Sequence, residues 1–175
     1  MINNFFLKDI AMKQFILKYV NDCEGWKTAI KQLHWNAKNL AQHKLCDEIA
    51  DTISDFQDQV SEVEQSISGN LPFNKLKGTP YKVSSLEKFI NDVIKTTNSF
   101  YDRLKKEGSD YVGMASDCES FLSEMQRKMY LAKFTIHEQR RRIVKLTESQ
   151  LHNVIKEAVK KSLITLDSRK SNKWS

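Results

Sequence analysis

One histidine and three carboxylates stand at spacings that could hold a metal ion. On a helix, which turns about 100° per residue, His43, Asp47, Asp58 and Glu62 lie at about 0°, 40°, 60° and 100°, in a single arc. Carboxylate oxygens neutralise a cation such as Fe(II), and imidazole nitrogens add affinity. The same segment carries four further carboxylates, Glu48, Asp51, Asp55 and Glu64. The alternative to a metal site is that all these carboxylates form an acidic face exposed to solvent.

The segment that carries this arc also has the clearest apolar pattern of the chain. Its apolar residues repeat at three- and four-residue spacings until Gly69, which predicts a helix with one buried seam. The seam centres near 240° on the same wheel, almost opposite the polar arc. A metal site on that arc faces away from the bundle core, so it must be closed by another chain or left to solvent. The seam residues are Leu45, Ile49, Ile53, Phe56, Val60, Val63 and Ile67.

The composition favours an all-α domain that positions this segment among other long helices. The chain has 175 residues with 40% hydrophobic content, enough for one core, and its five Gly and two Pro leave long stretches unbroken. Apolar spacing predicts further helices over about 9–37, 84–104 and 111–137, and Ser84 with Glu87 is the expected cap of the helix over 84–104. Residues 69–83 hold both prolines and predict one long middle connection, as in ferritin-like four-helix bundles. On the last helix Met114, Cys118, Phe121, Leu122, Met125, Met129 and Phe134 are the expected core positions.

The charge divides the chain into a neutral body and a basic tail. Residues 1–137 contain 18 basic and 18 acidic residues, whereas 138–175 contain 10 basic and 4 acidic residues. We therefore expect two parts, a bundle over 1–137 and a tail over 138–175 with an amphipathic helix at about 147–165. The helix has a capping signal at Thr147 with Gln150, and residues 167–175 are expected to be disordered. Its apolar face consists of Leu151, Val154, Ile155, Ala158, Val159 and Ile164.

Three cysteines, Cys23, Cys46 and Cys118, are odd in number and lack C-x-x-C spacing, which argues against disulfides and against structural zinc. We interpret Cys46 as structural.

No apolar run is long enough to cross a membrane, and the N-terminal residues lack the features of a signal peptide, so we expect a cytoplasmic protein. No E-x-x-H occurs, which excludes the paired motif of classical di-iron bundle cores.

The segment Leu33-His34-Trp35-Asn36, followed by His43, Asp47, Asp58 and Glu62, resembles the signature of Dps proteins, the iron-oxidising mini-ferritins. The compact spacing from His34 to His43 is similar to that of a Dps-like group encoded by crAss-like tailed phages. The resemblance covers about residues 10–137. It implies that His34, His43 and Asp47 of one subunit face Asp58 and Glu62 of a two-fold-related subunit, with non-haem iron between them.

The function implied by the resemblance is oxidation of Fe(II) by peroxide or oxygen at inter-subunit sites. Iron storage in a hollow shell, such as a dodecamer, and protection of DNA from peroxide would follow. In this family the neighbouring tryptophan can serve as an electron donor, although the residue type of Trp35 alone favours a packing role. The alternative function is non-enzymatic: a phage virion, cargo or assembly protein that keeps the bundle and docks through its C-terminal helix.

The tail admits three interpretations: a DNA-binding extension, a docking helix or a solvated end. Ten positive charges could bind phosphates without sequence preference. The apolar face, which phosphate binding does not require, favours docking instead. Residues 146–159 also resemble a short C-terminal helix found on many unrelated proteins of crAss-like phages, which implies a shared destination such as the virion or an assembly partner.

Overall fold

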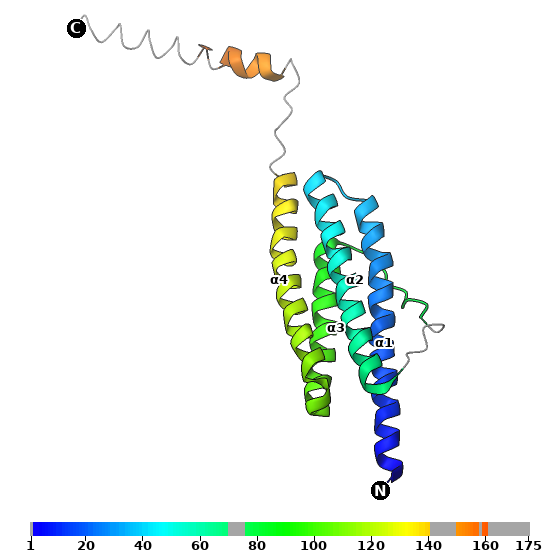
Figure 1. The fold of residues 1–175 in the computed structure, drawn as a ribbon. Helices are drawn as coiled ribbons and strands as arrows, with labels where there is room; N and C mark the ends of the chain where they lie inside the picture. Colours follow the sequence, from blue (N-terminus) through cyan, green and yellow to red (C-terminus); the bar gives the residue numbers. More distant parts are fainter. Residues whose placement is uncertain (1, 70–75, 141–149, 158, 161–175) are drawn as a thin grey trace, which may run out of the picture. The chain divides into compact units, whose positions relative to one another are not determined.

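The computed structural model describes residues 2–69, 76–140, 150–157 and 159–160, and every regular element in these ranges is helical (Figure 1). The all-helical class predicted from the sequence is confirmed. Backbone contacts divide the chain into two units, Met1–His137 and Glu138–Ser175. The elements are α1 (Ile2–Trp35), α2 (Leu40–Ser68), α3 (Leu86–Glu107), the short 3-10 helix η2 (Ser109–Tyr111) and α4 (Val112–Arg140).

Helix α2 buries the seam that its sequence predicts. Leu45, Ile49, Ile53, Phe56 and Val60 are at most 4% exposed, so this part of the prediction is confirmed. The last seam position is wrong, because Ile67, one residue before the end of α2, is 39% exposed.

The start of α2 is fixed by a side-chain cap. Asn39 has an extended backbone, and its Oδ1 accepts a hydrogen bond from the Gln42 backbone N–H at 2.7 Å, which satisfies a donor that has no partner within the helix. The Asn39 amide also donates to the Thr135 carbonyl of α4 at 3.2 Å. Asn39 therefore ends the α1–α2 turn and connects this turn to α4 by a hydrogen bond.

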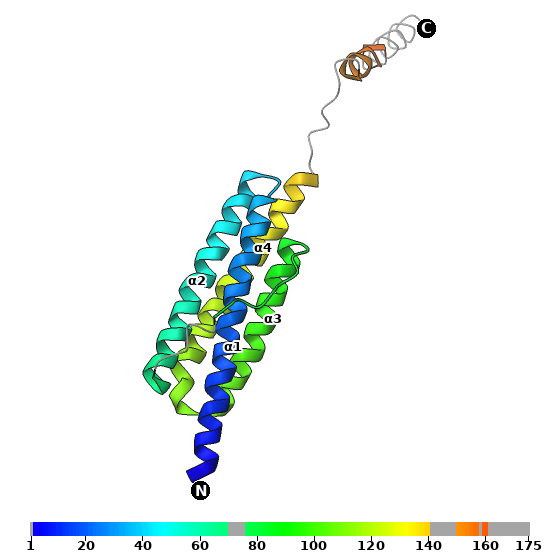
Figure 2. The same cartoon turned by 90° about the vertical axis from the view of Figure 1, so that its right-hand side faces the viewer.

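The middle connection crosses α1, so that α2 and α3 run in the same direction (Figures 1 and 2). The Thr79 N–H donates to the Asn21 carbonyl and the Lys77 N–H donates to Asn21 Oδ1, both at 2.9 Å. A Cβ atom added at Gly25 would lie 1.9 Å from the Thr79 carbonyl oxygen. Gly25, which weakens the helical pattern in the sequence, is therefore the residue that lets the connection lie against α1.

The cap of α3 differs from the prediction by one residue. Ser85, and not Ser84, has the extended backbone of an N-cap, and its hydroxyl accepts from the Lys88 N–H at 3.2 Å. Sequence spacing to Glu87 favours Ser84, but the first buried residue, Leu86, must already be helical to face the core. Gly108, at φ +104°, ends α3 after Glu107.

The core positions predicted on α4 are buried with one exception. Met114, Cys118, Phe121, Leu122, Met125 and Met129 are all at most 9% exposed. Phe134 is 51% exposed, so its assignment to the core is wrong. Nine residues separate it from Met125, and about 900° of helical rotation places it on the opposite face.

Glu64 is a fully buried carboxyl group on α2. Ser68 Oγ donates to its Oε1 at 2.5 Å, while its Oε2 has no hydrogen-bond partner among the described residues. Burial raises the pKa of Glu64, against a smaller lowering effect of Ser68 and Lys13. The raised folded-state pKa means that the ionised form destabilises the fold, and this cost grows as pH rises from the unfolded-state pKa to the folded-state pKa.

Replacing Glu64 by methionine should therefore raise the free energy of unfolding at pH 7 by about 1 kcal/mol, since an apolar side chain removes a carboxylate whose ionised form is disfavoured by burial. The gain should become small at about pH 3, which lies below the unfolded-state pKa of about 4.3, so that the wild-type carboxyl is mostly protonated in both states. Urea unfolding of the metal-free protein at the two pH values measures this. Glu62→Met, at an exposed carboxylate two residues away, is the matched control and should change stability by less than about 0.5 kcal/mol. Equal gains at both pH values would contradict the assignment of the cost to ionisation.

In the second unit, residues 150–157 and 159–160 are helical. Leu151, Val154, Ile155 and Val159 are each 48–54% exposed within the described residues. The apolar face predicted for the tail therefore exists on a helix. The predicted capping residue Thr147, the residues Ala158 and Ile164 of the predicted apolar face, and the end predicted to be disordered lie outside the described residues.

Candidate metal site

The turn between α1 and α2 brings three of the five predicted ligands together. His34 lies in the last turn of α1, and His43 and Asp47 lie one turn apart near the start of α2. Because only residues 36–39 separate the helices, the last turn of one faces the first turns of the next. Ligand atoms of the three side chains all lie within 4.8 Å of one another.

A close contact between an imidazole and a carboxylate orders this cluster. His34 Nδ1 lies 2.6 Å from Asp47 Oδ1, and the His34 and His43 rings have their centroids 3.7 Å apart at 44°. When Nδ1 carries the proton that Asp47 accepts, His34 presents Nε2 as a lone-pair donor, which is the arrangement common among metal-binding histidines. The side chains remain accessible, at 21% exposure for His34 and 56% for Asp47.

Two imidazoles and one carboxylate suit a borderline divalent cation such as Fe(II), Co(II) or Zn(II). Three ligands leave coordination positions open, and open positions are required for a site that admits water, oxidant or further ligands. The cluster can thus hold a metal ion by itself or act as one half of a larger site.

Asp58 and Glu62 do not join the cluster within the chain. Both side chains are exposed and lie one turn apart further along α2. Eleven residues separate Asp58 from Asp47, or about 16 Å of helix at 1.5 Å per residue. The five predicted ligands therefore form two groups on one outer face: a histidine group at the start of α2 and an acidic pair beyond it.

The outer face of α2 is strongly acidic. The helix contains seven acidic residues and one lysine, and the acidic residues other than Glu64 are exposed. Two such faces would repel each other in a dimer unless cations or basic groups lay between them.

A buried lysine that sequence reasoning missed supports the residue beside Asp47. Lys128 of α4 is 9% exposed, and its Nζ donates to Glu48 Oε2 at 2.6 Å. It also pairs with Glu124 Oε1 at 3.2 Å. Burial alone would lower the pKa of Lys128, but the hydrogen bonds to Glu48 and Glu124 raise it above its ordinary value. The only sequence signal was the place of Lys128 between Met125 and Met129 on the core side of α4.

Two neighbours of the cluster have contrasting environments. Cys46 is 1% exposed, and burial, with a smaller effect of Asp47, raises its pKa to about 11. A thiol in this state is a poor nucleophile and ligand, in agreement with its structural interpretation. Trp35 is 74% exposed, so the packing role that its residue type favours would need a contact with another chain.

Comparison with protein-family models, with curated proteins and with solved structures found no match for this chain. A search of the described residues for a helix long and apolar enough to cross a membrane found none.

Proposed function

We propose that this protein is a Dps-like iron-binding protein, which holds Fe(II) at sites shared between two subunits and oxidises it. The observation that carries the proposal is the convergence of His34, His43 and Asp47 to within 4.8 Å at the end of the α1–α2 hairpin. The parallel course of α2 and α3, joined by one long connection, also agrees with a ferritin-like bundle (Figure 1).

The separation of the acidic pair from the histidine group along α2 favours a site between subunits over a site within one chain. In an antiparallel pairing of two α2 helices, the acidic pair of one subunit would lie opposite the histidine group of the other. His34, His43 and Asp47 would bind the ion from one side, and Asp58 with Glu62 from the other. Iron ions held there would offset the repulsion between the two acidic faces. Each subunit pair would contain two equivalent sites, because a two-fold axis repeats every contact.

In the proposed reaction Fe(II) is the substrate, and the protein side chains hold it with positions open to oxidant. Two Fe(II) ions each give one electron to hydrogen peroxide, whose O–O bond breaks. With two water molecules the products are two FeO(OH) and four protons, which pass to solvent. Because both electrons reach one peroxide molecule, no hydroxyl radical is released, and the mineral can be stored in a shell of subunits while DNA is protected.

Subunit mixing tests whether the sites are shared. His43→Ala and Asp58→Ala each disable every site of a homodimer. In a heterodimer of the two variants, one site pairs two intact halves and the other pairs two damaged halves. Random mixing at equal amounts should therefore restore about a quarter of the wild-type iron oxidation, since half of the dimers are heterodimers. Peroxide-dependent Fe(III) absorbance measures it.

The control for mixing is each variant alone at the same total concentration, which should stay inactive. Absence of recovery at every ratio, while native mass spectrometry shows that mixed dimers form, would argue for sites completed within one chain.

A second candidate function is a virion, cargo or assembly protein that docks through its tail. It is favoured by the exposed apolar side chains Leu151, Val154, Ile155 and Val159 on one short helix. Such a face suits a hydrophobic groove on a partner protein. The basic tail also offers phosphate contacts, and DNA binding is the competing outcome.

Salt dependence separates docking from DNA binding. Phosphate binding should weaken by about 0.9 log units per log unit of salt for each phosphate contact and should tolerate Ile155→Asp. Docking of the apolar face should be nearly independent of salt and should be lost in Ile155→Asp, and this is the behaviour we expect. Lys156→Gln, which removes a neighbouring charge from the helix, is the matched control. A steep salt slope on DNA that survives Ile155→Asp would contradict docking.

A further inference from the structure

Helix α4 has a second regular seam on the side away from the bundle core. With Ser116 at zero on a helical wheel, the apolar residues that α4 buries lie between about 140° and 240°. Six exposed residues lie within about 40° of zero, directly opposite. They recur at alternating spacings of four and three residues, as the facing positions of paired helices do. This outer seam consists of Ser116, Ser120, Ser123, Arg127, Tyr130 and Phe134.

The C-terminal half of the outer seam presents large apolar side chains to solvent. Tyr130 is 62% exposed and Phe134 is 51% exposed, and their rings pack edge to face with centroids 4.6 Å apart. Leu131, 45% exposed, lies beside them. The aromatic pair is therefore already ordered, and clusters of exposed large apolar residues generally mark a contact with another molecule.

The N-terminal half of the outer seam has small side chains where the other half has rings. Ser116, Ser120 and Ser123 are all exposed. The Ser120 hydroxyl donates to the Ser116 carbonyl at 3.2 Å, so its hydrogen-bonding capacity is met within the helix. Small side chains let a second helix approach closely and leave space for large side chains on that helix.

We propose that the outer seam of α4 packs against the outer seam of a second copy of this chain, with the two helices antiparallel. A two-fold axis near Met125 brings residues equally far from Met125 in the sequence opposite each other. Phe134 then lies opposite Ser116 of the second copy, and Tyr130 lies opposite Ser120. Each ring meets a serine, so large and small side chains interdigitate along about 27 Å of helix.

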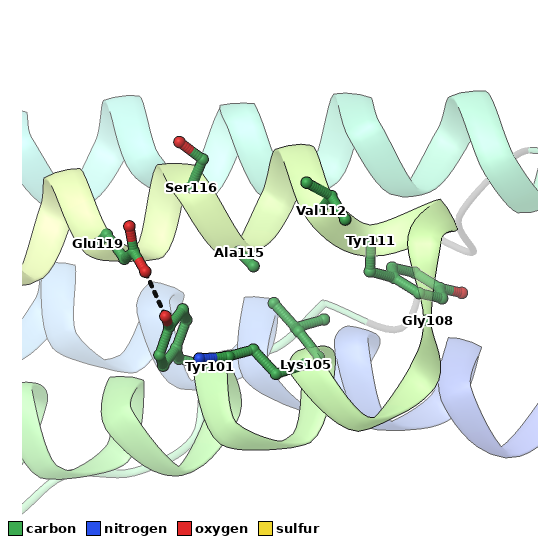
Figure 3. Close-up of a pocket in the computed structure, with 9 residues that line it drawn as sticks. Tyr101, Lys105, Gly108, Tyr111, Val112, Ala115, Ser116 and Glu119 are labelled. Carbon is green, nitrogen blue, oxygen red and sulfur yellow. Dashed lines mark hydrogen bonds between the residues drawn. The ribbon is translucent and has the colours of Figure 1, made fainter.

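The charges beside the seam match in the same antiparallel arrangement. Glu119, Gln126 and Lys133 lie seven residues apart on one flank, which faces α3. Antiparallel pairing places this flank beside the same flank of the second copy, so Glu119 faces Lys133 and Gln126 faces Gln126. Figure 3 shows Glu119 directed toward Tyr101 of α3, whose hydroxyl donates to one of its carboxylate oxygens, whereas Ser116 points away from α3. The second oxygen of Glu119 can accept from Lys133 of the second copy.

The other flank of the seam favours the antiparallel arrangement over a parallel one. Arg127 pairs with Glu124 of its own helix, and its side chain is 70% exposed. Near the axis the two Glu124 side chains approach each other, and the two Arg127 guanidinium groups lie where they offset this repulsion. A parallel pairing would instead place Glu119 beside Glu124 of the second copy and serines opposite serines, which is unfavourable in both charge and packing.

This contact is separate from the proposed metal site. It uses α4, whereas the metal site uses the α1–α2 turn and the outer face of α2. The acidic faces of α2 repel each other when no cation is present, so self-association of the metal-free chain reports on α4. Together with a pairing through α2, a second two-fold contact would extend a dimer into a larger assembly.

An exchange of charges tests the arrangement. Glu119→Lys and Lys133→Glu should each weaken self-association of the full metal-free chain about tenfold, because each turns two attractive pairs into two repulsive ones. Mixed in equal amounts, the two variants should associate again as heterodimers, in which both pairs are attractive. Sedimentation velocity measures the association, and native mass spectrometry of one ¹⁵N-labelled variant with the other unlabelled identifies the heterodimer. Lys95→Glu, at an exposed lysine of α3, is the matched control and should associate as the wild type does.

A change of size tests the seam itself. Ser120→Trp puts a bulky side chain where Tyr130 of the second copy must fit, and it should weaken self-association by about tenfold or more. Ser99→Trp is the matched control, because Ser99 is an exposed serine of α3 whose hydroxyl also donates to the carbonyl four residues earlier at 3.2 Å. Circular dichroism checks that each variant is folded. Phe134→Ser, which changes only an exposed side chain, replaces Ser120→Trp if the larger side chain prevents folding.

Three results would overturn the proposal. The first is a metal-free wild-type chain that stays monomeric at about 100 μM. The second is a mixture of Glu119→Lys and Lys133→Glu that associates no better than either variant alone. The third is loss of self-association in Ile155→Asp together with normal association of Ser120→Trp, which would assign the contact to the tail helix.

Discussion

Gly25→Ala should lower the free energy of unfolding by about 1–3 kcal/mol, although alanine is the better helix former. The added Cβ would lie 1.9 Å from the Thr79 carbonyl oxygen and 2.9 Å from its carbonyl carbon. Backbone atoms cannot rotate away as a flexible side chain can, so the connection must move off α1. That movement would stretch the hydrogen bonds from Thr79 N and Lys77 N to Asn21.

The matched control is Gly113→Ala in the first turn of α4. An added Cβ there meets nothing within 4 Å, so only helix propensity changes. Its free energy of unfolding should rise by up to about 1 kcal/mol. Chemical unfolding of both variants measures the difference, and its sign is the test. Stabilisation by Gly25→Ala would show that the connection does not lie against α1 in solution.

His43→Ala should weaken binding of Co(II), a spectroscopic substitute for Fe(II), at least tenfold, or about 1.4 kcal/mol. It removes one of the three ligands that lie within 4.8 Å of one another. Asp47→Asn should have a smaller effect, because an amide oxygen can still bind the ion but carries no charge. Equilibrium dialysis of the metal-free protein with Co(II) gives the affinities.

Asp55→Asn is the matched control for charge, because this exposed carboxylate lies on the same helix but outside the cluster. It should change the affinity by less than twofold. If all three variants reduced the affinity equally, the ion would be attracted by the general acidity of α2 and not held by the histidine group.

The sequence predicts much of this structure because α2 satisfies two constraints at once. Its apolar residues from Leu45 to Val60 must share a buried face, and the angle per residue then places Asp58 and Glu62 outward. The same rotation, applied to α4, would have excluded Phe134 from the core. The length of the α1–α2 turn brings His34 to His43, and that length is visible in the sequence.

Other features depend on tertiary contacts that no local pattern encodes. The role of Gly25 follows from the passage of Thr79 across α1, a contact between residues 54 positions apart. The ion pair of Lys128 with Glu48 joins α4 to α2 across 80 residues. The contact of His34 Nδ1 with Asp47 Oδ1 depends on side-chain rotation, which spacing alone does not determine. The sequence identifies Glu64 only as a further carboxylate on α2, because its spacing does not distinguish a buried glutamate from its exposed neighbours.

The central claim, that iron is bound and oxidised between subunits, is tested most directly by anaerobic Fe(II) titration followed by hydrogen peroxide. The measurement compares the wild type with the Asp58→Ala, Glu62→Ala double variant, whose substitutions lie outside the histidine group and on an exposed face. We expect the wild type to bind Fe(II) at a fixed number of ions per subunit pair and to oxidise it when peroxide is added. The double variant should remain folded and lose the oxidation. Equal oxidation by both proteins, or no saturable Fe(II) binding by the wild type, would contradict the proposed function.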